Sequence, residues 1–352
     1  MKIGLYGLPT AGKTSILEKI GFMDVLAGSK LLHEIDPDFD RLSDNSKNNV
    51  RRELATILRT KDSFIVDGHY AFGDKLAFTT EDGDLYDAFL YLYIEPNILK
   101  KRMENSEKNT QYLKYDIEKW QREEMEGLRE YCHNHNKDFY ILDNPLSNYF
   151  EDFTEIIKFI MAIKDGYSCV RYGRECTDAI LEADNSETII LADGDKTITI
   201  EDSTNMVFGY RTNLFDGNFY TGYQSWKHGN DIKIFKYQPK GSLPVHINEN
   251  ILERLHNHTY ILTSGHWDVW AYLSAHLHME YYFGNQMSAD TKYFITKFLQ
   301  QAGRTVIAYG DGMNDYYMLK QADEGYLVTK PDGSISRSLK NKDLGGIELV
   351  RN

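Results

Sequence analysis

The stretch Gly7-Leu8-Pro9-Thr10-Ala11-Gly12-Lys13-Thr14 directly follows an apolar segment at 2–6 and matches the pattern G-x-x-x-x-G-K-[ST]. In such a loop the glycines let the backbone approach phosphate oxygens, and N–H groups of the loop and the next helix converge on them. We expect Lys13 to reach the β- and γ-phosphates of a nucleotide and Thr14 to bind Mg²⁺ through its hydroxyl. The nucleotide-binding residues predicted from this stretch are Gly7, Gly12, Lys13, Thr14 and Ser15.

The bulk composition limits the classes of protein that the chain can form. A length of 352 residues exceeds one typical core and predicts two domains. No uninterrupted apolar run reaches membrane-spanning length, so we expect no transmembrane segment. The first strand begins so close to Met1 that no room remains for a signal peptide, and three cysteines without zinc-like spacing suit a reducing compartment, so we expect a cytoplasmic protein. A net charge of −13 disfavours nucleic acid as a partner, because phosphates are bound by clustered Lys and Arg.

Predicted strands and helices alternate along the chain, which indicates two α/β domains with parallel sheets at 1–165 and 166–352. In the first domain we expect strands at 2–6, 63–67, 88–94 and 139–142, and helices from the glycine loop to Gly21 and at 49–59, 97–105, 114–134 and 151–163. Residues 164–187 are interpreted as a linker and a leading helix. In the second domain we expect strands near 188–192, 260–262, 305–309 and 325–328, interrupted by an inserted subdomain at about 200–257.

A carboxylate and a basic residue extend the predicted N-terminal site. Asp67, in Asp67-Gly68-His69, ends an apolar strand, and an acid at this place lies beside Mg²⁺ or polarises the attacking group in phosphate-loop enzymes. With the glycine loop and Lys100-Lys101-Arg102, these residues make 1–160 resemble the small nucleotide and nucleoside kinases of the adenylate-kinase-like group. The resemblance implies a kinase fold in which Lys13 and Asp67 take part in catalysis and Arg102 closes over the transferring phosphate. ATP is favoured as the donor because the sequence has no Asn/Thr-Lys-x-Asp guanine motif.

The acceptor of the phosphate is not identified by the sequence. Such kinases place an acceptor-side base in the region that here contains His33, Asp36, Asp38, Asp40 and Arg41, and a solvated loop explains the same acids equally well. Arg51 and Arg52 are candidates to bind an acceptor anion, and a solvent-exposed structural role explains them equally well.

A second phosphate-handling motif, Asp193-Gly194-Asp195-Lys196-Thr197, follows the apolar strand 188–192. Residues two apart at a strand end point to the same side, so Asp193 and Asp195 are expected to share a divalent cation that relieves their repulsion. Asp193 is the candidate nucleophile that takes the phosphoryl group. Asp195 is the candidate acid that protonates the leaving oxygen and then deprotonates the water.

Later segments complete this pattern: Ser264 after a strand, Lys292 ahead of a predicted helix, and Gly310-Asp311-Gly312-Met313-Asn314-Asp315 after another strand. In order and spacing, 187–335 resembles the haloacid dehalogenase (HAD) superfamily, most closely its phosphoserine-phosphatase-like branch. The resemblance implies a Rossmann-like phosphatase fold with Mg²⁺. It implies catalytic roles for Ser264, in preference to Thr263, and Lys292, in preference to Lys297. The metal ligands that it implies are Asp193, Asp195, Asp311 and Asp315, and Asn314 is a candidate contact to the phosphate.

The insert at 200–257 and two departures from the motif bear on the substrate. The insert has the location of the mobile cap of this superfamily, which favours small phosphorylated molecules, and Tyr220, Tyr223 and Trp226 either line it or form its core. Glu201 or Asp202 matches the place where that branch meets its substrate's amine, with a loop acid as the alternative. Lys196 and Gly265-His266-Trp267 depart from the branch, so phosphoserine itself is not implied.

The sequence thus predicts a bifunctional enzyme, an ATP-dependent kinase joined to a phosphatase, acting on small metabolites. A polynucleotide end-healing kinase–phosphatase has the same domain order, and the acidic charge and the insert oppose it. A third interpretation makes the first domain a nucleotide-sensing switch that regulates the phosphatase.

Overall fold

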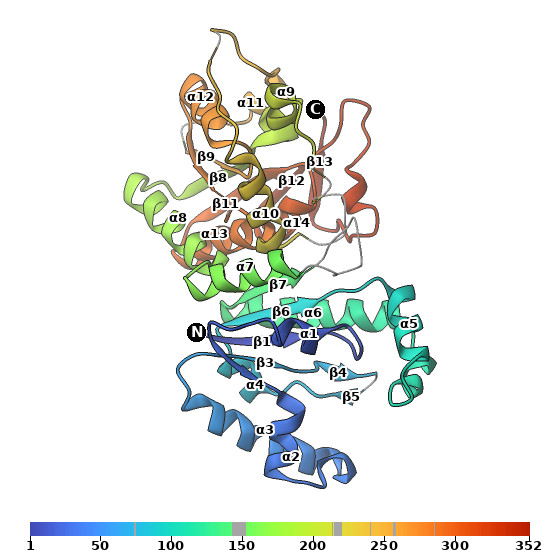
Figure 1. Cartoon of the computed structure of the whole chain (residues 1–352). Helices are drawn as coiled ribbons and strands as arrows, with labels where there is room; N and C mark the ends of the chain where they lie inside the picture. Colours follow the sequence, from blue (N-terminus) through green and yellow to red (C-terminus); the bar gives the residue numbers. More distant parts are fainter. Residues whose placement is uncertain are drawn as a thin grey trace. The chain divides into compact units, whose positions relative to one another are not determined.

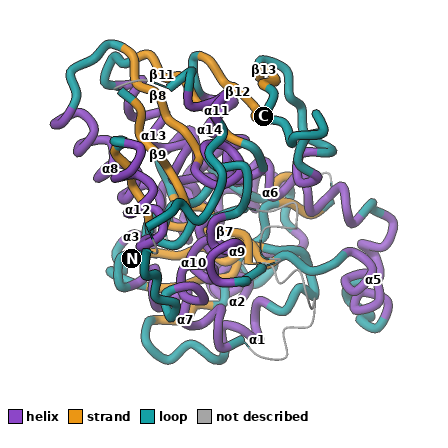
Figure 2. The backbone as a smooth tube through the Cα atoms, turned by 90° about the horizontal axis from the view of Figure 1, so that it is seen from above, coloured by secondary structure: helices purple, strands orange, loops and turns teal. Residues whose placement is uncertain are grey.

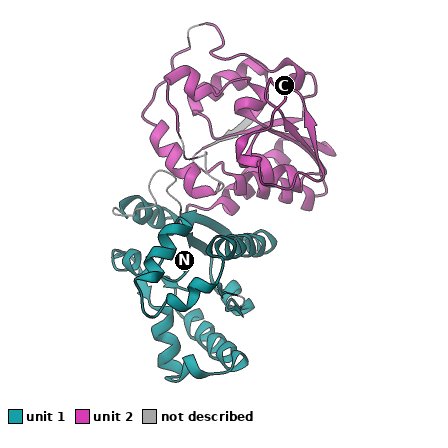
Figure 3. Cartoon of the chain, turned by 90° about the vertical axis from the view of Figure 1, so that its right-hand side faces the viewer, with its two compact units in different colours: residues 1–166 teal, residues 167–352 magenta. Residues whose placement is uncertain are grey.

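The computed structural model describes residues 1–73, 75–142, 153–212, 214, 220–239, 241–255, 258–284 and 286–352. The chain divides into two compact units, residues 1–166 and 167–352, coloured separately in Figure 3. Each unit has its own parallel sheet with helices between the strands, which confirms the predicted α/β class.

In unit 1 the strands form a parallel sheet in the order β2-β3-β1-β6-β7, with a separate antiparallel β4-β5 pair. Because β1 lies between β3 and β6, the loop that follows β1 emerges where the carboxyl ends of three strands meet, the usual ligand position in an open α/β sheet. The strands, most of them labelled in Figure 1, are β1 (Lys2–Tyr6), β2 (Asp24–Leu26), β3 (Phe64–Asp67), β4 (Ala71–Phe72), β5 (Lys75–Leu76), β6 (Ala88–Leu92) and β7 (Asp138–Leu142).

The helices of unit 1 connect these strands, and local capping sets where they begin. The helix expected at 49–59 begins five residues earlier, because the Ser43 hydroxyl accepts a hydrogen bond from the Ser46 N–H and caps it. The residues at 151 and 152 of the helix predicted at 151–163 lie outside the described residues. The helices are α1 (Lys13–Leu17), α2 (Gly28–Ile35), α3 (Asp44–Arg59), α4 (Thr80–Leu85), α5 (Pro96–Glu104), α6 (Ile117–His135) and α7 (Thr154–Lys164), with short 3₁₀ turns at Phe39–Arg41 and Thr110–Lys114.

In unit 2 the strands form a parallel sheet in the order β10-β9-β8-β11-β12-β13. Figure 2 shows β8, β9, β11 and β12 running together as orange segments with helices beside them. The strands are β8 (Thr188–Asp193), β9 (Thr259–Thr263), β10 (Glu280–Phe283), β11 (Thr305–Gly310), β12 (Glu324–Val328) and β13 (Ile347–Val350).

Both faces of this sheet are buried. Ile189 and Leu191 of β8 belong to one hydrophobic cluster, while Ile190 and Ala192 belong to another that includes Trp270 of α12, so alternate side chains enter opposite cores. Within the insert, α9 and α10 are separate helices, and α11 contributes Ile251 to the second core. The helices are α8 (Cys169–Ala183), α9 (Ser203–Phe208), α10 (Gly222–Ile232), α11 (Glu249–Leu252), α12 (Trp267–Leu277), α13 (Ala289–Gln301) and α14 (Met313–Gln321), with a 3₁₀ turn at Arg337–Leu339.

Among the residues that the structure describes, no helix combines the length and the apolar character that crossing a membrane requires.

Candidate functional site

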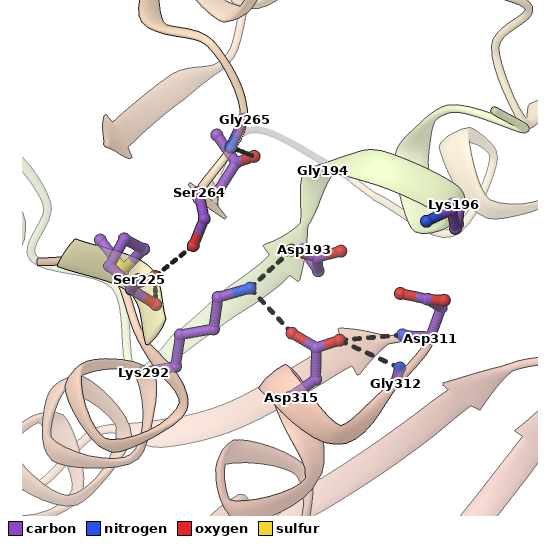
Figure 4. Close-up of polar contacts among 12 residues, drawn as sticks. Asp193, Gly194, Lys196, Ser225, Ser264, Gly265, Lys292, Asp311, Gly312 and Asp315 are labelled. Atoms are coloured by element: carbon purple, nitrogen blue, oxygen red, sulfur yellow. Dashed lines mark hydrogen bonds and ion pairs between the residues drawn. The ribbon is translucent and has the colours of Figure 1, made fainter. Parts of the chain in front are cut away.

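Four elements of unit 2 bring one lysine and three aspartates together (Figure 4). Asp193 ends β8, Asp311 follows the neighbouring strand β11, and Asp315 lies in the first turn of α14. Lys292 of α13 is completely buried, and its Nζ lies 2.5 Å from Asp193 Oδ1 and 2.8 Å from Asp315 Oδ1. The second oxygen of Asp315 accepts hydrogen bonds from the N–H groups of Asp311 (3.1 Å) and Gly312 (3.2 Å). The lysine thus joins the end of β8 to the first turn of α14, which are far apart in the sequence.

The electrostatics of this cluster favour a bound cation. Carboxylate oxygens of Asp193, Asp311 and Asp315 lie within 4.8 Å of one another. Burial and the Asp315 carboxylate raise the pKa of Asp193 to about 6 against the opposing Lys292 ammonium, and burial raises that of Asp311 well above its ordinary value. Burial alone would lower the pKa of Lys292, but the two adjacent carboxylates outweigh it and raise the value. Three acids facing one ammonium leave a negative excess, and carboxylate oxygens are suitable Mg²⁺ ligands.

Asp195 does not join that group, contrary to its expected place among the metal-binding side chains. Its Oδ1 accepts a hydrogen bond from the Ser203 N–H at 2.9 Å, and its other oxygen lies beside Gly265. The expectation assumed that the strand continues past Asp193, but β8 ends there and the chain turns, with Lys196 in a left-handed conformation. Burial raises the pKa of Asp195 to about 7, which suits a group that carries a proton near neutral pH.

The structure distinguishes between the alternatives for the hydroxyl and the lysine. The Thr263 hydroxyl is buried and accepts a local hydrogen bond from the Gly265 N–H, while the Ser264 hydroxyl donates to the Met287 carbonyl. Lys292, and not Lys297, contacts the aspartates. Lys292 was expected ahead of a helix, but it lies in the first turn of α13, because Ser288 caps that helix and accepts from the Thr291 N–H.

The insert is tied to this site by buried contacts. Tyr220, Tyr223 and Trp226 are buried, and Tyr220 belongs to a hydrophobic core. Of the two roles considered for these aromatic residues, burial favours core packing. The Ser225 hydroxyl of α10 donates to the same Met287 carbonyl as Ser264, at 3.5 Å. Ser225 was not predicted, because a serine within an aromatic segment carries no signal of its own.

The two acids considered for substrate binding in the insert are both engaged. Glu201 accepts hydrogen bonds from the backbone N–H and the ring of His246. Asp202 caps α9 through the Asn205 N–H and forms an ion pair with Lys196 at 3.2 Å. The Oδ1 atom of Asn314, considered as a phosphate contact, is buried without a hydrogen-bond partner.

In unit 1 the glycine loop joins β1 to α1 through a turn with three residues of positive φ. Gly7 and Gly12 have φ values of 143° and 105°, and Thr10 between them has 64°. The Lys13 ammonium is buried and donates to the carbonyls of Gly7 (2.5 Å) and Leu8 (3.2 Å) of its own loop. The loop borders a cavity of about 580 Å³, which Thr14 and Ser15 also line.

Two other predicted residues lie beside this loop. The Arg102 guanidinium donates to the carbonyls of Thr10 (3.3 Å) and Ala11 (3.2 Å), so the structure brings it to the loop backbone. Asp67 lines the cavity and accepts from the Gly28 N–H at the start of α2, at 2.8 Å.

Only some of the candidates for acceptor binding line this cavity. His33, Asp40 and Arg51 line it, and a His33–Asp40 contact of 3.2 Å joins the first two. The others are not among its lining residues: Asp38 pairs with Arg41, Arg52 pairs with Glu81, and Asp36 accepts from the Asp38 N–H. His69, Lys108 and Tyr112 line the cavity and were not predicted as site residues.

A buried carboxylate on α6 interacts electrostatically with the loop lysine. Glu124 accepts hydrogen bonds from the Ala71 N–H and the Trp120 ring at 3.0 Å and from the Tyr91 hydroxyl at 2.9 Å. Burial raises the pKa of Glu124 to about 7 and lowers that of Lys13 to about 8. The sequence contained a signal for Glu124, since it occupies the same helical face as the buried Trp120 and Leu128.

We predict that Glu124 makes the stability of unit 1 depend on pH. Its folded-state pKa exceeds the unfolded value, so the folded chain binds more protons and stability falls as pH rises from 5 through 7. Between pH 5 and 8 the wild type should lose on the order of 2 kcal/mol more than Glu124→Gln, which keeps an acceptor for the Ala71 N–H. Urea unfolding of the full chain measures this, with the exposed Glu123→Gln as control. The same pH dependence in all three proteins would contradict the prediction.

Comparison with known proteins found solved structures that are similar to parts of the chain. No protein-family model matches the chain, and no curated protein matches its sequence. A solved structure of shikimate kinase from Acinetobacter baumannii in complex with shikimate is similar, with a TM-score of 0.33 and 16% identity over 46% of this chain and 94% of that one. A HAD family hydrolase from Salmonella enterica subsp. enterica serovar Typhi has a TM-score of 0.33 and 18% identity over 47% and 67%. The catalytic domain of a CPx-ATPase has a TM-score of 0.26 and 20% identity over 44% and 81%.

Proposed function

We propose that the chain is a bifunctional phosphate-transfer enzyme, with a phosphomonoesterase site in unit 2 and an ATP-dependent kinase site in unit 1. The observation that carries the proposal is the buried Lys292 ammonium held between Asp193 and Asp315, with Asp311 beside them. A buried ammonium among acids creates a place where a dianionic phosphate and a carboxylate can approach each other.

The hydrolysis that we propose proceeds in two steps. An Asp193 oxygen attacks phosphorus and the bond to the ester oxygen breaks, while Asp195 gives its proton to the leaving alkoxide. Water then attacks the aspartyl phosphate, its proton returns to Asp195, and inorganic phosphate leaves. Lys292 offsets the charge of the nucleophile and of the phosphoryl oxygens. Asp193, Asp311 and Asp315 are the residues that would hold Mg²⁺, which when bound supplies charge neutralisation of the phosphoryl group.

For unit 1 we propose transfer of the γ-phosphate of ATP to a hydroxyl. Lys13 would exchange its own loop carbonyls for phosphate oxygens, and Thr14 would hold Mg²⁺. Arg102, which donates to the loop carbonyls of Thr10 and Ala11, would contact the transferring group. Asp67, at the cavity wall, would position the acceptor or the cation. The nearby His33, Asp40 and Arg51 are the proposed acceptor-side groups.

The phosphatase proposal is tested with p-nitrophenyl phosphate and the full chain. We expect hydrolysis with Mg²⁺, loss of hydrolysis with EDTA and recovery on adding Mg²⁺. Asp193→Asn should lower the rate by at least about 10³-fold, because the amide cannot form the covalent intermediate. Metal-independent hydrolysis, or equal rates in the variant, would reject the proposal.

One observation favours a polynucleotide as the acceptor, the second candidate function. A further cavity of about 470 Å³ combines basic with aromatic walls, a pattern that suits single-stranded nucleic acid. It shares six lining residues with the first cavity: Phe39, Asp40, Arg51, Phe72, Ala77 and Tyr112. Its basic and aromatic lining residues are Lys47, Arg51, Lys75, Lys114, Phe39, Phe72, Tyr112 and Tyr115. Asp40 and Asp44 also line it, and Asp44 already pairs with Lys75. ADP formation with thymidine and with a 5′-hydroxyl decathymidylate separates the candidates: faster turnover of the oligonucleotide supports a polynucleotide acceptor.

A further inference from the structure

We propose that Lys196 selects phosphomonoesters whose leaving group carries a second anionic group, such as a carboxylate or another phosphate, close to the ester oxygen. The inference rests on the phosphatase function proposed above and names the substrate class of that site.

The backbone at Lys196 is the first observation. Its φ of 64° and ψ of 6° are left-handed, a conformation that glycine adopts more easily than lysine. The other non-glycine residues with positive φ in the described parts of the chain are Thr10, Asn136 and His278. Asn136 and His278 end helices, where this conformation is common, whereas Thr10 lies in the glycine loop. A lysine kept in a strained turn three residues after the proposed nucleophile Asp193 indicates a use for its side chain.

The position of the ammonium is the second observation. Lys196 and Lys292 lie on opposite sides of Asp193 and Asp311 in Figure 4. Lys292 is buried and already paired with two acids, whereas the Lys196 side chain is 53% exposed. The proposed phosphate site therefore has an inner cation for the phosphoryl group and an outer cation toward solvent, where the leaving group departs.

The partner of Lys196 can be exchanged without disturbing the fold. Asp202 Oδ2 lies 3.2 Å from Lys196 Nζ, while Asp202 Oδ1 caps α9 through the Asn205 N–H. The capping oxygen holds Asp202 in place whether or not the lysine is present. A substrate anion competes with this one carboxylate oxygen for the ammonium, and an exposed ion pair is weak enough to be displaced.

A competition experiment with the full chain and Mg²⁺ tests the proposal. p-Nitrophenyl phosphate is the reporter, and the competitors are 3-phosphoglycerate and glycerol 1-phosphate, which differ in a carboxylate. We expect the wild type to bind 3-phosphoglycerate roughly twofold to fivefold more tightly, the range of one partly exposed ion pair. Lys196→Met should remove the preference, and Lys196→Arg should retain it. Asp202→Asn keeps the cap, frees the lysine, and should strengthen 3-phosphoglycerate binding.

The matched control is Lys320→Met, since Lys320 forms an ion pair with Asp343 of the same 3.2 Å length away from the aspartate cluster. It should keep the wild-type preference. Equal inhibition constants for the two competitors in the wild type, or a preference that survives in Lys196→Met, would overturn the inference while leaving the phosphatase intact. If the wild type with Mg²⁺ hydrolyses the reporter no faster than Asp193→Asn does, the proposed function itself is rejected.

Discussion

Replacing Lys292 with methionine is expected to abolish hydrolysis by unit 2 and to lower its free energy of unfolding by about 3–5 kcal/mol, the effect of removing one partner of a buried ion pair. Methionine fills similar space but leaves Asp193 and Asp315 buried without the ammonium that lies 2.5 and 2.8 Å from them. The rate should fall by at least about 10³-fold, because the charge opposite the phosphoryl group is lost. Urea unfolding and hydrolysis of p-nitrophenyl phosphate measure the two effects.

A matched variant and a double variant separate folding from chemistry. Lys297→Met removes a lysine from the same helix without touching the aspartates, and its stability should stay within about 1 kcal/mol of the wild type. The double variant Lys292→Met with Asp315→Asn removes one of the stranded charges. It should recover stability and remain inactive. Activity in the folded double variant would show that Lys292 has no part in the reaction.

The second large effect is expected at Lys13. Lys13→Met should reduce ATP turnover by unit 1 by about 10²- to 10³-fold. This is the usual effect of removing one preorganised hydrogen-bond donor that stabilises charge in the transition state. Its stability should change much less than in the Lys292 variant. Burial already lowers the pKa of Lys13 to about 8, and its hydrogen bonds go to backbone carbonyls of Gly7 and Leu8, so no buried acid directly bonded to it is stranded by the change.

ADP release in the presence of candidate acceptors measures this effect, and Lys19→Met, at an exposed position just past α1, serves as the control. Hydrolysis of p-nitrophenyl phosphate by unit 2 should stay at the wild-type rate. Undiminished ATP turnover in Lys13→Met would contradict the kinase proposal. If nucleotide still binds to the wild type but no acceptor stimulates its turnover, the nucleotide-sensing interpretation becomes the better one.

The comparison of sequence and structure shows which strands a pattern can reveal. The predicted strands β1, β3, β6 and β8 are apolar because their side chains are buried on both faces of a sheet. The strands that were missed in the two main sheets, β2, β10 and β13, are edge strands with a neighbour on one side. Val25 of β2 and Leu349 of β13 are exposed, so burial does not impose an apolar run there.

The site residues divide in the same way. The pattern of the glycine loop pointed to Gly12-Lys13-Thr14, which follows β1, and the resemblance pointed to Asp311 and Asp315, which follow β11. The Asp195 side chain lies apart from the other three acids because strand alternation does not extend past the end of β8. The cavity-lining Lys108 and Tyr112 belong to no motif, and only the folded chain brings them to the cavity beside the glycine loop.

The sequence by itself determined that the chain has two α/β parts, each with an apolar strand leading into a phosphate-handling turn, because burial and turn geometry act over a few residues. The tertiary structure alone decided which side chains meet. Lys292 reaches Asp193 across 99 positions because strand order and the register of α13 place them together. Such contacts depend on how whole helices and strands pack against one another. They therefore cannot be predicted from the composition or the residue spacing of a short segment.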